Sequence, residues 1–100
     1  MIDAKNQDLA FIAKTIRKHI PDCEIRVFGS RIKGTARPYS DIDIAIVAKN
    51  SISPLTLERI KEEFAQSDIP YRVDILDFKT ISDSFRRVIE DGYEVLYDLT

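Results

Sequence analysis

Apolar residues recur at two spacings along this chain, and the two spacings alternate from one segment to the next. In residues 7–20 they fall every three or four positions, which predicts a helix with one buried face. Asn6 can cap the start of this helix, and Pro21 ends it because proline cannot continue a helix. The apolar face consists of Leu9, Ile12, Ala13, Ile16 and Ile20.

Two later segments show the same helical spacing. Ser53 followed by Pro54 predicts a helix start, because serine is a favoured cap and proline fits the first helical position. A last helix is expected to begin at the sequence Thr80-x-x-Asp83 and to end near Gly92. The inward positions of the first of these helices are Leu57, Ile60 and Phe64, and one face of the second carries Ile81, Phe85, Val88 and Ile89.

Between the helices, apolar and polar residues alternate with the period of strands that bury one face. Such strands are predicted at residues 24–28, 41–48 and 69–76, and a short edge strand at 93–97. The polar connection of residues 29–40 is expected to contain a short helix.

The elements follow one another without a linker, a repeat or a change of composition. This order predicts a single α/β (α+β) domain over residues 1–100, with helices packed on one sheet. The pattern does not fix the strand directions. An antiparallel pairing of the first two strands therefore stays open.

Composition narrows the class of protein. Hydrophobic residues make up 44% of the chain and charged residues 32%, a balance typical of globular proteins. The longest apolar runs have about four residues, whereas a membrane helix needs about 20. The first residues lack the apolar core of a signal peptide, so we expect a cytoplasmic protein. Cys23 and His19, the only members of their types, are too few for a Cys/His metal site.

The charge balance bears on the partners. Fifteen Lys and Arg residues stand against 17 Asp and Glu residues, a formal net charge of −2. Proteins that grip a nucleic-acid backbone usually carry a surplus of basic residues. Direct nucleic-acid binding is therefore not expected, and a small molecule or a protein is the favoured partner.

Two aspartates share one face of the second predicted strand. Asp41 and Asp43 lie two residues apart, which places their Cα atoms roughly 6.5 Å from each other. Aspartate is unfavourable in strands, and two on one face repel, so a cation is expected to neutralise them. Mg²⁺ fits, because it binds carboxylates together with substrate phosphates. A solvated strand end is the alternative for this pair taken alone.

Gly29 and Ser30 follow the end of the first predicted strand, and ten residues separate Ser30 from Asp41. Glycine lets the backbone approach a phosphate closely, and serine offers a hydroxyl and an N–H. Arg31 and Lys33 follow directly and are expected to meet a bound triphosphate. An ordinary glycine turn with solvated charges is the alternative for this stretch taken alone.

A third carboxylate, Asp74, belongs to the third predicted strand and points away from the core face. If the second and third strands are neighbours, Asp74 joins the aspartate pair on one surface. Asp77 is expected to face away from Asp74. The alternative for Asp74 is a surface position or an ion pair with Arg72.

The motif Gly29-Ser30, ten residues, then Asp41-Ile42-Asp43 resembles the Gly-Ser-x10-Asp-x-Asp signature of minimal nucleotidyltransferase domains. These domains belong to the DNA polymerase β-like superfamily. The similarity includes most of residues 29–44, and residues 73–77 resemble the strand that carries the third carboxylate. The resemblance implies a polymerase β-like fold, a small mixed β-sheet packed with helices, over nearly the whole chain.

The resemblance also implies roles. Asp41, Asp43 and Asp74 would be catalytic and would ligate two Mg²⁺ ions, and Gly29 with Ser30 would hold the outer phosphates of a nucleoside triphosphate. An acceptor oxygen would then attack the α-phosphorus in line with the departing pyrophosphate, between metals roughly 3.5–4 Å apart.

The domains that the chain resembles are typically paired with a helical HEPN-domain protein, the two acting as antitoxin and ribonuclease toxin. Some transfer AMP to a tyrosine of that partner. We therefore expect Mg²⁺-dependent transfer of AMP from ATP to a tyrosine of a HEPN toxin. Two alternatives remain open: transfer to the hydroxyl of a small molecule, and a non-catalytic antitoxin that neutralises its partner by binding.

Overall fold

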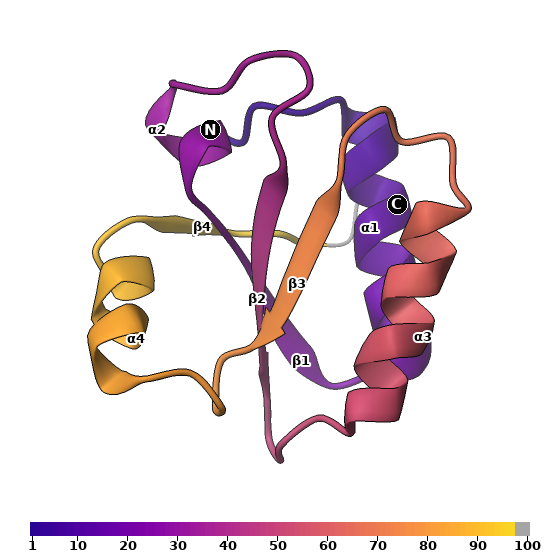
Figure 1. Ribbon diagram of the computed structural model, residues 1–100, viewed down its shortest axis with the longest axis vertical. Helices are drawn as coiled ribbons and strands as arrows, with labels where there is room; N and C mark the ends of the chain where they lie inside the picture. The colour runs from indigo at the N-terminus through magenta and orange to yellow at the C-terminus, as the bar shows by residue number, and fades with distance from the viewer. Residues whose placement is uncertain (98–100) are drawn as a thin grey trace.

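Helices and strands alternate along the chain in the predicted order (Figure 1). The computed structural model describes residues 1–97. The helices are α1 (Asn6–His19), α2 (Ser30–Lys33), α3 (Pro54–Ala65) and α4 (Asp83–Glu90), and the strands are β1 (Cys23–Phe28), β2 (Ile42–Ala48), β3 (Val73–Asp77) and β4 (Tyr93–Val95).

The four strands form one mixed sheet in the order β3-β2-β1-β4. Strand β1 is antiparallel to both β2 and β4, which answers the question of direction that the sequence left open. Strand β2 is parallel to β3, because α3 crosses from the end of one to the start of the other. The mixed sheet that the resemblance implied is confirmed.

Helices α1 and α3 cover one face of the sheet, where the hydrophobic core lies (Figure 1). The core consists of most of the predicted apolar positions of both helices and of alternate positions in the strands, whereas the predicted Ile20 and Leu57 are partly buried and pack against it. Ile44, in the centre of β2, is fully buried. The other core residues are Leu9, Ile12, Ala13, Ile16, Ile25, Val27, Ile42, Ile46, Ile60, Phe64, Val73, Ile75 and Leu96.

Helix α4 lies on the other side of the sheet (Figure 1). Its Phe85 ring meets the Phe28 ring of β1 edge to face, with 5.9 Å between the ring centroids. On this face of the sheet, α4 lies over β1, and the first residues of β2 and β3 are not covered by α4.

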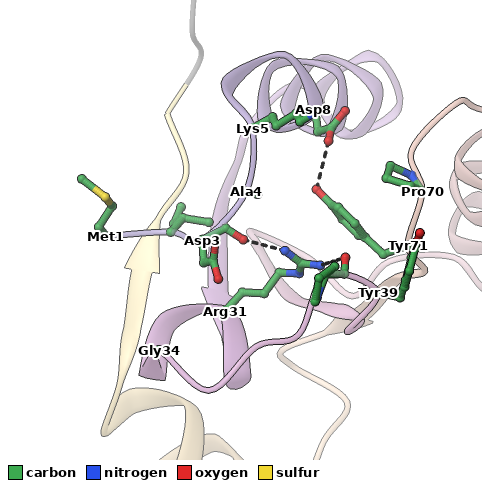
Figure 2. A pocket seen from close by; sticks show the side chains of 12 residues that line it. Met1, Asp3, Ala4, Lys5, Asp8, Arg31, Gly34, Tyr39, Pro70 and Tyr71 are labelled. Atoms are coloured by element: carbon green, nitrogen blue, oxygen red, sulfur yellow. Dashed lines mark hydrogen bonds between the residues drawn. The ribbon is translucent and has the colours of Figure 1, made fainter.

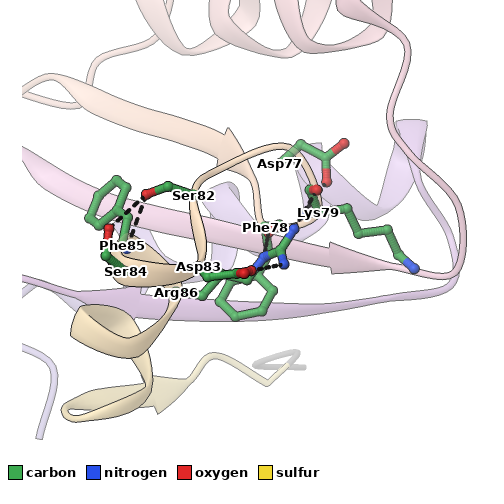
Figure 3. A network of polar contacts seen from close by, with 8 residues as sticks. All are labelled: Asp77, Phe78, Lys79, Ser82, Asp83, Ser84, Phe85 and Arg86. Carbon is green, nitrogen blue, oxygen red and sulfur yellow. Dashed lines mark hydrogen bonds and ion pairs between the residues drawn. The ribbon is translucent and has the colours of Figure 1, made fainter.

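Several predicted ends of elements were wrong. The cap of α4 is Ser82, whose hydroxyl accepts a hydrogen bond from the Phe85 N–H (Figure 3). Thr80 instead donates its hydroxyl hydrogen to the Asp77 carbonyl. Helix α1 begins at Asn6 itself, with Lys5 in the cap position. Strand β3 begins at Val73, four residues later than predicted.

None of the helices in residues 1–97 combines the length and the apolar character that crossing a membrane requires.

Candidate active site

The parallel pairing of β2 with β3 brings two carboxylates side by side. Asp43 lies directly opposite Asp74 in the register of the two strands. Their neighbours Ile44 and Ile75 are buried under α1 and α3, so both aspartates belong to the opposite face. Asp41 immediately precedes β2 and is exposed. The three predicted carboxylates therefore gather where the two strands begin.

The pKa of the Asp43 carboxyl reflects its burial and the charges around it. Partial burial raises the pKa of the Asp43 carboxyl, and the negative charges of Asp74 and Asp41 raise it further. The Arg72 guanidinium works in the opposite direction and lowers this pKa. Asp74 and Asp41 thus repel the charged form of Asp43, and a bound cation would offset this repulsion.

Arg72 is the cation beside this group. Its Nη2 lies 3.8 Å from Asp74 Oδ1, and the two side chains are 72% and 46% exposed. An ion pair with that much exposure is screened by water and holds neither partner firmly. The ion pair considered for Asp74 therefore exists, and it leaves Asp74 accessible.

The carboxylates do not form a closed cage. Within residues 1–97, no three acidic, histidine or cysteine side chains are arranged closely enough to hold a metal ion by themselves. Mg²⁺ is commonly bound by one or two carboxylates, with water and substrate phosphates completing an octahedron. An open, purely carboxylate group fits that ion when a phosphate arrives with it.

Gly29 lies against the same carboxylates because its neighbour Phe28 is paired with Asp43 across β1 and β2. The backbone of Gly29 has φ 82° and ψ −154°, a conformation essentially restricted to glycine. A Cβ at this position would overlap Asp43 Oδ2 and lie 3.2 Å from Asp43 Cγ. Only glycine therefore lets the Asp43 carboxylate rest against the backbone here.

Ser30 and Lys33 are the two ends of α2, the short helix predicted within the connection. Ser30 is half-buried and follows Gly29, the residue that lies against Asp43, directly in the chain. Lys33 is exposed. Gly34 ends the helix in the left-handed conformation, with φ 77°.

Arg31 does not join this group. Its side chain is 5% exposed and points into a groove on another side of the α2–β2 connection (Figure 2). Its guanidinium donates hydrogen bonds to the carbonyls of Asp3, Pro38 and Ser40. These bonds occupy the group that was expected to meet a phosphate, so we leave Arg31 out of the nucleotide site.

The groove beside Arg31 has a volume of about 780 Å³. It lies between the N-terminal segment, the start of α1, the α2–β2 connection and the residues before β3 (Figure 2). Its described lining does not include Asp41, Asp43 or Asp74. This groove therefore lies beside the carboxylate group and does not contain it.

Two residues of this groove, Asp8 and Tyr71, were not singled out by the sequence. The Tyr71 hydroxyl donates to Asp8 Oδ2 over 3.3 Å, and the ring of Tyr71 is stacked against Arg31 at 3.9 Å (Figure 2). Burial, followed by the charge of Asp8, raises the pKa of Tyr71 to about 12. No local pattern marks such a contact, because Asp8 and Tyr71 are 63 residues apart.

Asp77 points to the helix-covered side, as predicted, and is 2% exposed. Its Oδ2 accepts from the Ile52 N–H over 2.8 Å and its Oδ1 from the Lys79 N–H over 3.0 Å. Figure 3 shows this carboxylate beside the turn that follows β3. Asp77 therefore holds two loops together and takes no part in the carboxylate group.

A comparison with protein families gives one match over nearly the whole chain. The family described as polymerase beta, nucleotidyltransferase, matches residues 7–99. The Haemophilus influenzae "Probable protein adenylyltransferase MntA" is 40% identical over 97 residues. This alignment covers 97% of the present chain and 85% of that relative.

Solved structures show the same likeness. A toxin–antitoxin structure with AMP-PNP has a chain that superposes with a TM-score of 0.78 at 27% identity, over 95% of this chain and 75% of that one. A second structure contains a tri-AMPylated HEPN toxin of Shewanella oneidensis in complex with an MNT antitoxin. It matches with a TM-score of 0.72 at 26% identity, over 93% of this chain and 71% of the other.

Proposed function

Because the chain belongs to the polymerase β nucleotidyltransferase family and is a nucleotidyltransferase, we propose that it transfers AMP from ATP to a tyrosine of a HEPN toxin. In this proposal it is the antitoxin of that pair. The observation that carries the chemistry is the convergence of Asp41, Asp43 and Asp74 beside the side-chain-free backbone of Gly29.

In the proposed reaction the three carboxylates would hold Mg²⁺ together with the phosphates of the nucleotide. The bound metal would neutralise the phosphates and stabilise the charge that develops on the entering and leaving oxygens. Asp43 and Gly29 are in contact, so a phosphate on the glycine backbone lies next to the carboxylates. Ser30 donates its N–H and hydroxyl to the outer phosphates, and exposed Lys33 adds a positive charge nearby.

Asp74 is the carboxylate to which we assign the activation of the acceptor hydroxyl. This carboxylate is 46% exposed, so a hydroxyl from another molecule can reach it. Asp74 orients the acceptor hydroxyl and takes its proton as the oxygen attacks the α-phosphorus and pyrophosphate leaves. The choice of a protein tyrosine is supported by the 40% identical relative, which is described as a protein adenylyltransferase. It is also supported by the AMPylated toxin in the Shewanella complex.

The test is transfer from each of the four nucleoside triphosphates, labelled at the α-phosphate, in Mg²⁺ with a purified HEPN toxin. We expect label from ATP on a tyrosine of the toxin, located by mass spectrometry. The double variant Asp41→Asn, Asp43→Asn should abolish transfer. Asp22→Asn, which neutralises an exposed aspartate in the α1–β1 turn, should leave it intact.

Other outcomes contradict parts of the proposal. Equal transfer by the double variant would overturn the metal assignment. Label on a small molecule from a cell extract, with none on the toxin, would identify a different acceptor. A tight complex that silences the toxin without any labelling would show a non-catalytic antitoxin.

A further inference from the structure

Arg31 is a charged side chain inside the fold, and backbone oxygens surround it. Its Nη1 donates to the Asp3 carbonyl over 2.7 Å. Its Nη2 donates to the carbonyls of Pro38 and Ser40 over 3.1 and 2.8 Å, and Nε reaches Ser40 as well. The planar guanidinium thus binds two separate chain segments with one set of fixed donors.

The positions of these contacts connect them with the carboxylates. Arg31 follows Ser30 directly, and the Ser40 carbonyl that it holds belongs to the residue before Asp41. Its guanidinium also lies 3.9 Å from the centre of the Tyr71 ring, three residues before Asp74. One side chain therefore contacts the segments that carry the phosphate half of the site, the aspartate pair and the third carboxylate.

We infer that Arg31 is a positioning residue for nucleotidyl transfer: it fixes the entry to β2 against α2, and so holds Asp41 and Asp43 beside Gly29. This inference rests on the proposed function. Arg31 touches neither nucleotide nor metal in this role. It acts through the Ser40 carbonyl and the Tyr71 ring.

The N-terminal segment completes the arrangement. The Asp3 N–H donates to the Arg31 carbonyl over 2.8 Å, while the Arg31 side chain donates to the Asp3 carbonyl. Tyr71 is held in turn by its hydrogen bond to Asp8 at the start of α1. Residues that precede the site by nearly thirty positions therefore brace the connection from Ser30 to Asp41.

A lysine cannot replace this group. Its ammonium is a single point charge, so it cannot contact carbonyls in two segments with the fork geometry of arginine or stack flat on the Tyr71 ring. Arg31→Lys therefore keeps the positive charge and loses the contacts that hold the entry to β2 against α2. A displacement of about 1 Å at reacting groups can slow a reaction about a hundredfold. We therefore expect kcat at saturating ATP and Mg²⁺ to fall by about tenfold to a hundredfold.

The experiment separates positioning from general stability by hydrogen exchange, which needs no activity. In Arg31→Lys, the backbone amides of residues 41–43 should exchange about tenfold faster or more, while those of residues 46–48 at the far end of β2 stay unchanged. Arg59→Lys, on an exposed face of α3, is the matched control and should change neither kcat nor exchange. Uniformly faster exchange with an unchanged kcat would overturn the inference.

Chemical rescue provides a second readout, because Arg31 lines the groove of about 780 Å³. In Arg31→Ala, millimolar methylguanidinium can enter the space left by the side chain, and it should restore part of kcat. It should not restore the Asp41→Asn, Asp43→Asn variant. If Arg31→Ala does not fold, Arg31→Lys decides the matter alone.

Failure of the inference differs from failure of the proposed function. If the wild-type chain transfers no nucleotide to any toxin, the proposed function fails, and the local exchange pattern still tests the brace. If the wild type is active and Arg31→Lys has the same kcat and the same exchange at residues 41–43, the positioning role is wrong.

Discussion

Among single residues, Gly29 and Gly34 have similar φ values in very different surroundings. Both lie at positive φ, 82° and 77°. Gly29 is pressed against the Asp43 carboxylate, whereas no described atom beyond the chain neighbours lies within 4 Å of a Cβ built on Gly34. Their ψ values differ, −154° at Gly29 and 18° at Gly34. Gly29 therefore combines a backbone conformation restricted to glycine with a collision in the site, whereas Gly34 has only the milder left-handed conformation.

Gly29→Ala should abolish nucleotidyl transfer and destabilise the fold by about 1–3 kcal/mol, because the strained backbone is joined by an overlap with Asp43. Gly34→Ala should destabilise by about 1 kcal/mol from the left-handed backbone alone. Its transfer rate should remain near that of the wild type. Urea denaturation and the labelling assay measure both. Full activity in Gly29→Ala would contradict the close packing of this glycine.

The charge of Asp43 predicts a pH dependence of stability. Its pKa is raised in the folded chain, so the fold binds this proton more tightly than the unfolded chain does. Protonated Asp43 therefore contributes fully to the stability of the fold below about pH 4, and this contribution is lost as the pH rises through the folded-state pKa. The asparagine introduced by Asp43→Asn carries no charge at any pH. This variant therefore avoids the loss of stability and removes the repulsion from Asp74 on the neighbouring strand.

In chelator at about pH 7, Asp43→Asn should therefore be more stable than the wild type by about 0.2–1 kcal/mol, the usual size of a cross-strand charge effect. The difference should shrink toward about pH 4. Thermal melts over this pH range give the comparison, with Asp22→Asn as the exposed control. A lower melting temperature for Asp43→Asn at neutral pH would exclude carboxylate repulsion at this site.

The sequence pattern predicted the positions of some residues in and around the site but not of others. Asp43 and Asp74 could be placed on one face, because strand side chains alternate and their neighbours are isoleucine and valine. Arg31 could not be placed, because its partners Asp3 and Ser40 lie 28 and nine residues away. Its neighbours in sequence suggested a phosphate ligand, and only the folded chain shows what surrounds it.

At the scale of elements, β1 and β2 were predicted within one residue at each end, whereas β3 begins four residues later and β4 ends two residues earlier than predicted. Residues 69–72 continue the apolar and polar alternation into the segment before β3. Pro70 lacks the backbone N–H that a strand ladder needs. A sequence pattern cannot distinguish a strand from an extended approach to one.

The two serine caps of this chain also differ in a way that only structure reveals. Ser82 accepts a hydrogen bond from the Phe85 N–H, but the Ser53 side chain makes no cap hydrogen bond to the described residues. Ser82→Ala should lower the free energy of unfolding by about 1 kcal/mol, and Ser53→Ala by less than about 0.5 kcal/mol. Urea melts of both variants measure the difference. Equal losses would show that the hydroxyl bond at α4 adds nothing.

Across the whole molecule, the site is assembled from parts that are distant in sequence. Gly29 follows the end of β1, Asp43 lies near the start of β2 and Asp74 near the start of β3. The sheet order β3-β2-β1 makes them neighbours. The carboxylates therefore come together only in the folded chain. A ligand that needs all three must bind the folded state and stabilise it.

ATP with Mg²⁺ should raise the melting temperature on the order of 10 °C when the nucleotide exceeds its Kd about a hundredfold, since that excess contributes about 2.7 kcal/mol. Neither ATP in chelator nor Mg²⁺ alone should match this shift. Differential scanning fluorimetry measures it. In the Asp41→Asn, Asp43→Asn variant the shift should largely disappear, and a shift of equal size would place the nucleotide elsewhere.

The backbone conformation of Gly29 is one that a D-amino acid adopts readily. Reversing the signs of its φ of 82° and ψ of −154° gives ordinary extended backbone. The position therefore suits an amino acid of the opposite configuration. D-alanine introduced at position 29 by chemical synthesis should retain this backbone and carry its methyl group on the other side, away from Asp43. A mirror-image residue would thus leave the fold intact and test only whether phosphates approach the glycine from that side.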